Sequence, residues 1–376
     1  MTATSIKLIA GALLDGPTKT MTEDAPKAWK AVVDSVNKAG GICGRLINVT
    51  VVNNLFGKAP DLGAEPYVGM LVGPFDPHFG DRVGDGSVDR WGIPAVASDG
   101  SSKAHFQSPW SWPVGISASA STRIAVDEAY RVAGARTFAL VHDGSASWGH
   151  EAAAAFSQYV PTLPGAEVRV VTALDPAKPS YSTEANEFNS RCGSQKCDAT
   201  VLALLPETAK KWWQAGPASA TKRTSATQLL FSERVGQDCV LLVGSACDGL
   251  LAWTGFTPPI TPFTGDPDVA EYDAAMGGST NAATTGAYVA AKVLVAALRQ
   301  AGPNLTRATL RRALDDLTFT SGLASRLDWG PRLPVDRVAN LSARAVRMTV
   351  SGGTFRGWTD AGTGWVRDPW PGSFPD

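Results

Sequence analysis

Short apolar runs and amphipathic segments alternate from residue 6 to residue 256, and this alternation limits the fold more than any other feature of the chain. The apolar runs have the length and composition of strands, whereas apolar residues in the segments between them recur at helical spacing. The predicted strands cover residues 6–14, 46–52, 68–73, 93–97, 137–143, 167–174, 199–205, 227–232 and 250–256. Predicted helices cover residues 120–133, 149–160, 183–191 and 207–215. This order indicates an α/β protein with parallel sheets flanked by helices.

The first predicted helix follows the strand at residues 6–14. Glu23 and Asp24 stand near its start, Pro26 lies in its first turn, and Gly40-Gly41 ends it. One apolar face is formed by residues at positions i, i+3, i+4 and i+7, which are Trp29, Val32, Val33 and Val36. We therefore expect this helix to pack against a sheet.

The last hundred residues begin with helices and end differently. An alanine-rich helix is predicted over 280–302, and Thr306 is a suitable N-cap for a short helix over 307–316. Beyond these, short strands are predicted in "SRLDWG" and in "RAVRMTVSGGTFRGW", with a turn at Gly352-Gly353. The Pro/Gly/Trp-rich tail is expected to be irregular. The Gly/Asp-rich stretch 80–86, nearer the N-terminus, is expected to form a loop.

The length and composition fit a two-domain globular protein. The chain has 376 residues, 44% of them apolar and 18% charged, and a formal net charge of −1. Because Lys and Arg are scattered, nothing points to nucleic acid or an anionic membrane as a partner. No apolar stretch reaches the length of a membrane span. The start "MTATSIKLIAGALLD" does not resemble a signal peptide, so we expect either a cytosolic protein or an exported one whose signal segment was removed.

Five cysteines bear on that choice. Cys192 and Cys197 form one closely spaced pair, Cys239 and Cys247 form another, and Cys43 is left over. Neither spacing matches that of zinc ligands. Two local disulfides in an exported protein are the favoured interpretation, and reduced buried thiols are the alternative. Cys43 is expected to be a free, buried thiol.

No catalytic motif, cofactor fingerprint or metal site is recognisable, and we expect a binding protein rather than an enzyme. Polar loops follow the predicted strands, where open α/β sheets bind their ligands. These loops are 13–18, 73–78, 98–102, 143–150, 204–208 and 232–235. Several combine hydroxyl groups, one acid and one aromatic side chain. Such a combination suits a zwitterion or a small polar acid with an apolar group.

The order of four motifs resembles that of the extracellular solute-binding proteins of ABC transporters, in the leucine/isoleucine/valine-binding branch of the type I periplasmic-binding-protein fold. Each motif is weak alone, but together they cover most of the chain. They are "AVVDSVNKAGGICGRLINVTVV" (31–52), "GMLVGPFDP" (69–77) with "WGIPAVASDGSS" (91–102), "ARTFALVHDGSASWGHEAAAAF" (135–156) and "LTFTSGLASRLDWGP" (317–331).

The resemblance implies two doubly wound parallel-sheet lobes joined by three crossover hinge segments, near 113–117, 252–257 and 319–325. The first lobe would comprise 1–116 and 255–320, and the second 117–254 and 321–376. It also implies a monomeric protein, periplasmic or a cell-surface lipoprotein, that binds a small molecule without a cofactor and serves an ABC permease. A ligand-sensing domain of a signalling or regulatory protein is the alternative, and an amide hydrolase ranks third.

The resemblance further implies which residues contact the ligand. Carried over position by position, the contacts are Leu14 (or Asp15), Phe75, Asp76, Ser98, Asp99, Gly100, Ser101, Ser102, Trp148, Leu205, Glu233 and Phe256. Four of these sites have a simpler alternative: a polar turn at 98–102, a surface aromatic at Trp148, a Glu233–Arg234 ion pair, and hinge packing at Phe256.

Asp76 and Asp99 depart from the family pattern. Amino-acid binders carry small neutral groups at these positions, and an acid there would repel a ligand carboxylate. These two residues put a plain branched-chain amino acid in doubt. They leave room for a cationic, amide or hydroxyl-rich ligand.

Overall fold

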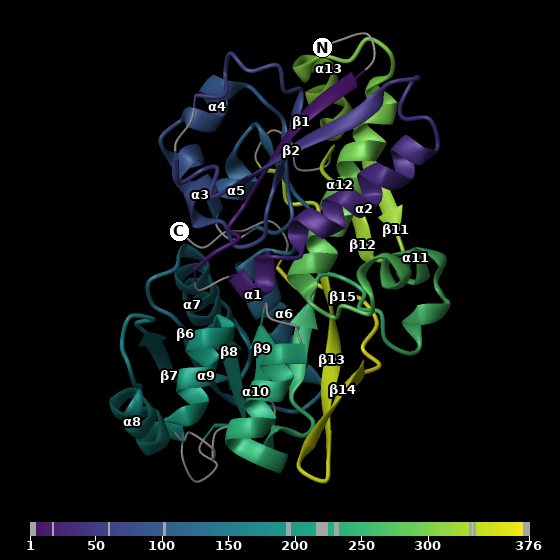
Figure 1. Ribbon diagram of the computed structural model, residues 1–376. Helices are drawn as coiled ribbons and strands as arrows, with labels where there is room; N and C mark the ends of the chain where they lie inside the picture. Colours follow the sequence, from purple (N-terminus) through teal and green to yellow (C-terminus); the bar gives the residue numbers. More distant parts are fainter. Residues whose placement is uncertain are drawn as a thin grey trace.

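The computed structural model describes residues 5–16, 19–58, 61–100, 103–192, 197–215, 225–228, 233–330, 333 and 336–370. Two lobes, each built on one large sheet, lie one above the other (Figure 1). The strands of the first sheet are β1 (Ser5–Ala12), β2 (Leu46–Asn53), β3 (Gly69–Val72), β4 (Ala95–Ala97) and β5 (Ser111–Pro113). They are parallel and follow the order β2-β1-β3-β4-β5. The carboxyl ends of β3 and β4 therefore lie side by side.

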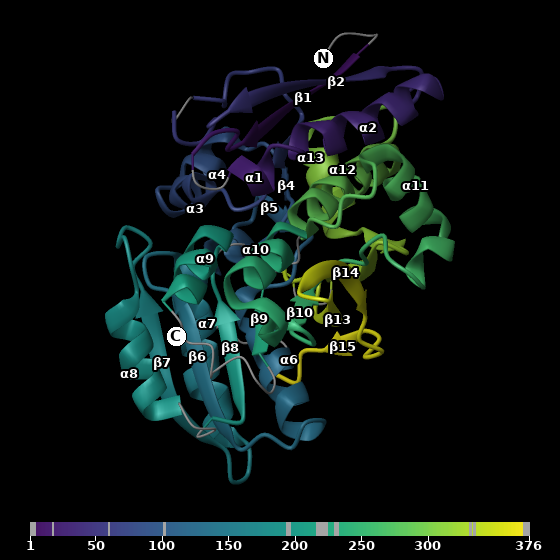
Figure 2. The ribbon, with the colours of Figure 1, turned by 60° about the horizontal axis from the view of Figure 1, so that its bottom comes forward.

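Helices cover both faces of the first sheet (Figure 2). On one face, the apolar side of α2 (Ala25–Lys38) packs with α12 (Ala282–Ala301), and Trp29 is buried as its spacing predicts. On the other face, Phe56, Phe79 and Trp91 pack against the strands. The remaining helices of this lobe are α1 (Lys19–Thr22), α3 (Pro77–Gly84), α4 (Ser87–Trp91), α5 (Lys103–Gln107), η4 (Phe263–Gly265), α11 (Pro267–Met276) and α13 (Arg307–Asp315).

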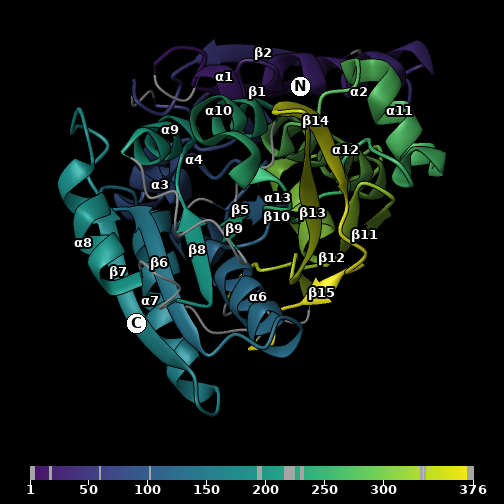
Figure 3. The same ribbon diagram turned by 90° about the horizontal axis from the view of Figure 1, so that it is seen from below.

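The second sheet is larger and mixed. Its strands are β6 (Thr137–Asp143), β7 (Glu167–Leu174), β8 (Ala199–Ala203), β9 (Ser225–Gln228), β10 (Leu251–Thr254), β13 (Ser342–Ser351), β14 (Thr354–Asp360) and β15 (Val366–Arg367). The order is β14-β13-β10-β9-β8-β6-β7, and β15 pairs with β13. From β7 to β10 the strands are parallel, whereas β13 is antiparallel to β10. Figure 3 shows this sheet from below, with its helices on both sides. They are α6 (Ala118–Arg131), α7 (Ser147–Tyr159), η1 (Val160–Thr162), α8 (Ser182–Cys192), α9 (Pro206–Gln214), α10 (Glu233–Val243) and η3 (Gly244–Cys247).

The loop predicted at residues 80–86 is wrong over most of its length, because α3 extends to Gly84. Asp76 caps this helix by accepting a hydrogen bond from the backbone N–H of His78, and Pro77 occupies the first helical position. Burial of Phe79 then fixes the helix on the sheet. The prediction of a loop rested on the glycine and aspartate content alone and did not consider the Asp76 cap or Pro77.

Three connections join the lobes. The chain leaves β5 for α6, leaves β10 for α11, and returns to the second sheet at β13. The segment 319–325, predicted as the third crossing, instead lies in a hairpin of β11 (Thr318–Ser321) and β12 (Ala324–Asp328). Leu323 and Leu327 of that hairpin belong to the core of the first lobe. We place the third crossing at 336–341, and the exact lobe boundaries stay a prediction.

Asn340 ties the three connections together. Its buried side-chain amide donates to the carbonyl of Val114 (3.2 Å) and to that of Gly255 (3.1 Å), and its oxygen accepts from Ser325 Oγ (2.9 Å). Gly255 allows this approach, because a Cβ there would lie 3.0 Å from the Asn340 amide nitrogen and 3.1 Å from Ile116. One side chain therefore links the first two crossings to the third.

Both predicted disulfides are present, Cys192–Cys197 and Cys239–Cys247. The expectation of a buried Cys43 is wrong, because this free cysteine is exposed. It has a φ of +50° in the turn between α2 and β2, where Gly41 and Gly44 also take positive φ. A tight turn on the surface leaves its side chain in solvent.

Removing the Cys239–Cys247 disulfide should lower the free energy of unfolding. The bond closes a loop with a sequence separation of 8, and loop-closure entropy predicts a loss of about 2–3 kcal/mol. A Cys239→Ala/Cys247→Ala variant measured by chemical denaturation tests this, with Cys43→Ser as the neutral control. Thiol titration of the denatured, unreduced protein should find one thiol, and five would contradict both bonds.

The C-terminal segment is mostly irregular up to Trp370, as expected, apart from the two-residue strand β15, and it is anchored to α6. Beyond the short strand β15, the carboxylate of Asp368 forms a bidentate ion pair with Arg123 of α6, at 2.9 and 2.6 Å. Both side chains are almost completely buried. Within the described part of the chain, no helix is long and apolar enough to span a membrane.

Candidate ligand-binding cleft

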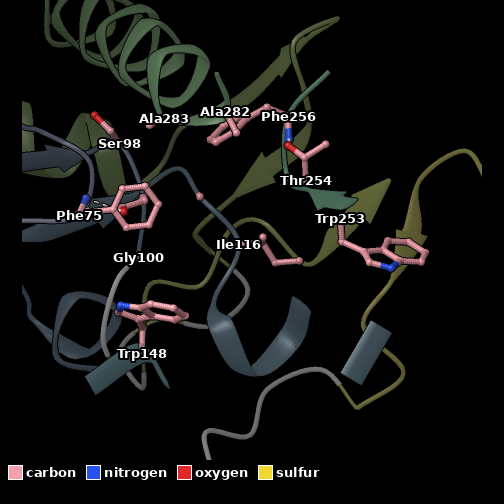
Figure 4. Close-up of a pocket in the computed structure, with 13 residues that line it drawn as sticks. Phe75, Ser98, Gly100, Ile116, Trp148, Trp253, Thr254, Phe256, Ala282 and Ala283 are labelled. Atoms are coloured by element: carbon pink, nitrogen blue, oxygen red, sulfur yellow. Dashed lines mark hydrogen bonds between the residues drawn. The ribbon is translucent and has the colours of Figure 1, made fainter. Parts of the chain in front are cut away.

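A deep pocket lies between the lobes, beside the first two crossings. It contains an empty volume of about 540 Å³, part of which is open to solvent. It is lined by Phe75, Ser98, Asp99, Gly100, Gly115, Ile116, Trp148, Trp253, Thr254, Gly255, Phe256, Ala282 and Ala283. Figure 4 shows Phe75 and Trp148 at one end, Trp253 at the other, and Ile116 between them. Both lobes and both crossings therefore contribute to one mainly apolar pocket.

An outer cleft of about 1690 Å³, also partly open to solvent, adjoins the deep pocket and shares Phe75 and Trp148 with it. Its other lining residues are more polar. They are Leu13, Asp15, Gly16, Asn54, Pro77, His78, Gly80, Asp81, Lys103, Ala104, His105, Ser145, Ala146, Ser147, Glu151, Pro176 and Leu205. A ligand could therefore place an apolar part inside and polar groups outside.

Trp148 reaches the cleft because the glycine after it allows close packing. A Cβ on Gly149 would lie 2.0 Å from the carbonyl oxygen of Asp143, at the end of β6. Only glycine lets the first turn of α7 approach the strand end this closely. Asp143 in turn accepts hydrogen bonds from the backbone N–H of Leu205 (2.7 Å) and from Thr208 Oγ1 (2.8 Å). The strand end thus positions both Trp148 and Leu205.

Phe75 is held in an unusual backbone conformation by Asp99. Its φ is +53°, which is strained for an aromatic residue. Its backbone N–H donates to Asp99 Oδ2 at 2.8 Å, between the ends of the neighbouring strands β3 and β4. This bond directs the Phe75 ring to the boundary between the deep pocket and the outer cleft.

The second oxygen of Asp99 is unpaired in the described part of the chain. Oδ1 is buried and has no hydrogen-bond partner among the described residues, where no ion pair involves Asp99 either. Burial raises the pKa of Asp99 to about 7, against the stabilising bond from Phe75, and nearby Asp76 raises it further. Ser98 cannot donate here, because its hydroxyl already donates to the Val72 carbonyl at 2.8 Å. Asp99 is thus the main unused polar group of the deep pocket.

Asp76 has a different role. It is fully buried, caps α3, and lines neither the pocket nor the cleft. Burial raises its pKa to about 6, although the charge of His78 and two backbone hydrogen bonds oppose the rise. The structure therefore assigns Asp76 to the helix start rather than to a ligand.

Two titratable groups of the outer cleft have shifted pKa values, the half-buried Glu151 and the buried His105. Glu151 accepts a hydrogen bond from the backbone N–H of Lys103, and burial raises the pKa of Glu151 to about 7. Burial lowers the pKa of His105 to about 4, so its ring is neutral near pH 7. Over the described residues, no group of three His, Cys, Asp or Glu side chains could hold a metal ion.

The predicted contacts divide into three groups. Those that line the pocket or the cleft are Phe75, Ser98, Asp99, Gly100, Trp148, Leu205 and Phe256. Leu14 and Asp76 line neither, because Leu14 packs against the first-lobe core and Asp76 caps α3. Leu13 and Asp15, the neighbours of Leu14, do line the cleft. Ser101, Ser102 and the side chain of Glu233 lie outside the described residues, although Glu233 begins α10.

Sequence reasoning missed several lining residues. Trp253 and Thr254 end β10, directly before the second crossing, and Gly115 and Ile116 belong to the first crossing. Ala282 and Ala283 form the start of α12. An apolar strand end before a crossing could have revealed Trp253, but small residues such as the alanines give no chemical signal.

The comparisons with known proteins agree with this architecture. The family described as periplasmic binding protein matches residues 11–353, and the chain belongs to this family. A sequence comparison with curated proteins finds no match. The family and the solved structures are substrate-binding proteins rather than enzymes.

Three solved structures illustrate the similarity. A fatty acid ABC transporter substrate-binding protein from Thermomonospora curvata is 16% identical, with a TM-score of 0.77 and coverage of 100% of this chain and 94% of the other. A branched-chain amino acid ABC transporter protein from Thermus thermophilus with bound valine is 15% identical, with a TM-score of 0.75 and coverage of 100% and 98%. A solute-binding protein from R. palustris in complex with 4-hydroxybenzoate is 14% identical, with a TM-score of 0.74 and coverage of 97% and 98%.

At these identities the likeness shows the fold alone. The prediction of a type I periplasmic-binding-protein fold is confirmed. The narrower leucine/isoleucine/valine-binding branch stays a prediction.

Proposed function

We propose that this protein captures a small amphipathic molecule between its lobes and delivers it to an ABC permease outside the cytoplasm. The observation that carries the proposal is the deep pocket, which both lobes and two crossings line together. Rotation of the lobes about the crossings would close the outer cleft over a ligand, the hinge closure described for periplasmic binding proteins. Closure buries the ligand's polar groups, so unmatched hydrogen bonds would be costly and would set specificity.

The lining favours a ligand with an apolar or aromatic body and a compact polar group, such as an amino-acid-like molecule, an amide or an aromatic acid. Phe75, Trp148, Trp253 and Phe256 supply apolar surface, and the outer cleft supplies polar groups. The similar structures name a fatty acid transporter, valine and 4-hydroxybenzoate. Valine joins an apolar side chain to one polar end, whereas 4-hydroxybenzoate carries a polar group at each end of an aromatic ring.

Trp148→Ala should weaken ligand binding about tenfold or more, because the ring borders both the pocket and the cleft. A thermal-shift screen of amino acids, amines, amides and aromatic acids would identify ligands, since a hundredfold excess over Kd stabilises the protein by about 2.7 kcal/mol. Titration calorimetry then compares the variants. Trp370→Ala, at a tryptophan that lines neither the pocket nor the cleft, is the matched control. Equal affinity in both variants would contradict this cleft.

Delivery needs a separate experiment. Deletion of the gene in its host should abolish high-affinity uptake of the radiolabelled ligand, and the wild-type gene should restore it. Unchanged uptake together with a lost transcriptional or behavioural response would favour the sensor alternative.

A further inference from the structure

The deep pocket combines aromatic walls with one carboxylate that has an unused oxygen. Asp99 Oδ1 is buried without a hydrogen-bond partner among the described residues, while Oδ2 accepts the backbone N–H of Phe75. Among the described residues that line this pocket there is no lysine or arginine. A buried, unsatisfied acceptor is costly until a ligand supplies a donor. The pocket therefore suits a ligand that supplies a hydrogen-bond donor to Asp99.

We propose that the ligand is an organic cation, an amine with an aliphatic or aromatic body, whose ammonium group binds Asp99 Oδ1 in the deep pocket. The proposal rests on the proposed function and names its substrate class. The family resemblance implies that the loop after β4 binds a negatively charged ligand carboxylate. In this proposal the same loop binds a positively charged ligand group.

The aromatic side chains suit the same charge. Phe75 and Trp148 stand at one end of the pocket (Figure 4), and the faces of such rings attract cations. The attraction is stronger in a pocket that excludes water, where the ring replaces part of the hydration shell. An ammonium group can thus contact Asp99 while its carbon chain lies against the rings.

The outer cleft is also predominantly acidic. Among the described residues, its lining includes the carboxyl groups of Asp15, Asp81 and Glu151, against one lysine, Lys103. Glu151, whose pKa is raised to about 7, is only partly ionised near neutral pH. A cleft lined mainly by one sign of charge concentrates ligands of the opposite sign and speeds their entry. The acidic residues of the outer cleft therefore favour the same cationic ligand as Asp99 in the deep pocket.

The helix N-termini near the pocket favour an anionic ligand rather than a cationic one. Helices α6, α7 and α12 begin near the pocket, and helix N-termini favour negative charge. Two of these ends already have side-chain caps, since Ser117 accepts from the Ala120 N–H and Asn281 from the Ala283 N–H. A competition between a cation and an anion of the same shape measures which influence dominates.

The decisive experiment compares ligands that share one body. Isoamylamine, 4-methylpentanoate and leucine form one set, and phenethylamine, 3-phenylpropionate and phenylalanine form another. Titration calorimetry on the whole chain should find the amine to be the tightest ligand of at least one set. Asp99→Asn should weaken amine binding about ten- to hundredfold, the loss expected for a hydrogen bond to a charged group. The asparagine side-chain oxygen can still accept the Phe75 N–H, which keeps the pocket wall in place.

Asp76→Asn is the matched control. It neutralises the neighbouring buried carboxyl, which lines neither the pocket nor the cleft, and it should leave amine affinity within about threefold of the wild type. An equal loss in both variants would mean that Asp99 acts through general electrostatics or folding, and would overturn the proposal.

Amine binding should also depend on pH. The other titratable groups that line the cleft are Asp15, His78, Asp81, Lys103, His105 and Glu151. Asp76 lies close enough to act on the charge of Asp99, although it lines neither the pocket nor the cleft. A cation binds the ionised form of Asp99, whose pKa of about 7 in the empty protein then falls. Affinity should therefore fall by up to tenfold per pH unit below about 7, level off above it, and lose this dependence in Asp99→Asn.

Two outcomes would separate the proposal from the function on which it rests. If a carboxylate or amino acid binds more tightly than its amine and Asp99→Asn leaves or improves that affinity, the cation proposal fails while ligand capture stands. If no compound of any class binds or stabilises the protein, and uptake by the deletion strain is unchanged, the transport function itself fails.

Discussion

Arg123→Ala is expected to lower the free energy of unfolding by about 3–5 kcal/mol, the largest effect of any single substitution considered. The guanidinium donates to both oxygens of Asp368, at 2.9 and 2.6 Å, and the two side chains are 4% and 1% exposed. Without Arg123, the Asp368 carboxylate would remain buried and without its cation. Chemical denaturation at pH 7 measures the loss.

The loss should come from the unpaired charge rather than from the pair's own strength. Taking two charges out of water costs nearly as much as their attraction returns, so removing both partners costs less than removing one. Arg123→Met/Asp368→Leu should therefore be more stable than Arg123→Ala. Lys30→Ala, which breaks an exposed ion pair with Asp34 on α2, should change stability by less than about 1 kcal/mol. Similar losses in the lysine and arginine variants would contradict the burial argument.

The ion pair also fixes the chain beyond the last strand. Asp368 donates its backbone N–H to the Leu341 carbonyl and accepts from the Trp370 N–H. Leu341 immediately precedes β13, close to the third crossing. Loss of Arg123 should therefore loosen the C-terminal segment first, and hydrogen exchange at residues 366–370 should rise more than in β6.

The sequence predicted the regular elements well where local and tertiary preferences agree. Strands β6 and β7 have the predicted bounds, and α2 has both its buried face and its predicted ends. In contrast, α10 and α11 were not predicted, because the first overlaps a cysteine pair and the second follows a proline-rich stretch. The composition around these two segments resembles that of loops. They form helices because they pack on the sheets, which composition does not reveal.

The candidate site was predictable to the level of loops but not of side-chain roles. Phe75, Asp99 and Trp148 follow strand ends, so the rule for open sheets placed them near one edge. It could not distinguish Asp76, which caps a helix, from Asp99, which lines the pocket. The different roles of Asp76 and Asp99 depend on the hydrogen bond that the Phe75 N–H donates to Asp99. This bond requires a left-handed backbone at Phe75, which no sequence pattern predicts.

Asn340 had no sequence signal either, and its substitution provides the second large prediction. Asn340→Ala removes two donors from buried backbone carbonyls, those of Val114 and Gly255. Since each unsatisfied buried acceptor costs about 1–3 kcal/mol, the free energy of unfolding should fall by about 3 kcal/mol. The next residues along both crossings, Gly115 and Phe256, line the deep pocket, so ligand affinity should fall as well.

Ser325→Ala is the control for Asn340→Ala, because it removes a polar neighbour of Asn340 but leaves the two bonds that the Asn340 amide donates. It removes the bond that Ser325 Oγ donates to the Asn340 oxygen, but that oxygen still accepts the Ser342 N–H at 3.3 Å. The expected loss is therefore only about 1 kcal/mol, with ligand affinity unchanged. Equal effects of the two substitutions would show that the crossings do not depend on the Asn340 amide. A larger effect of Asn340→Ala on both stability and affinity would show that one side chain couples the geometry of the crossings to the pocket between the lobes.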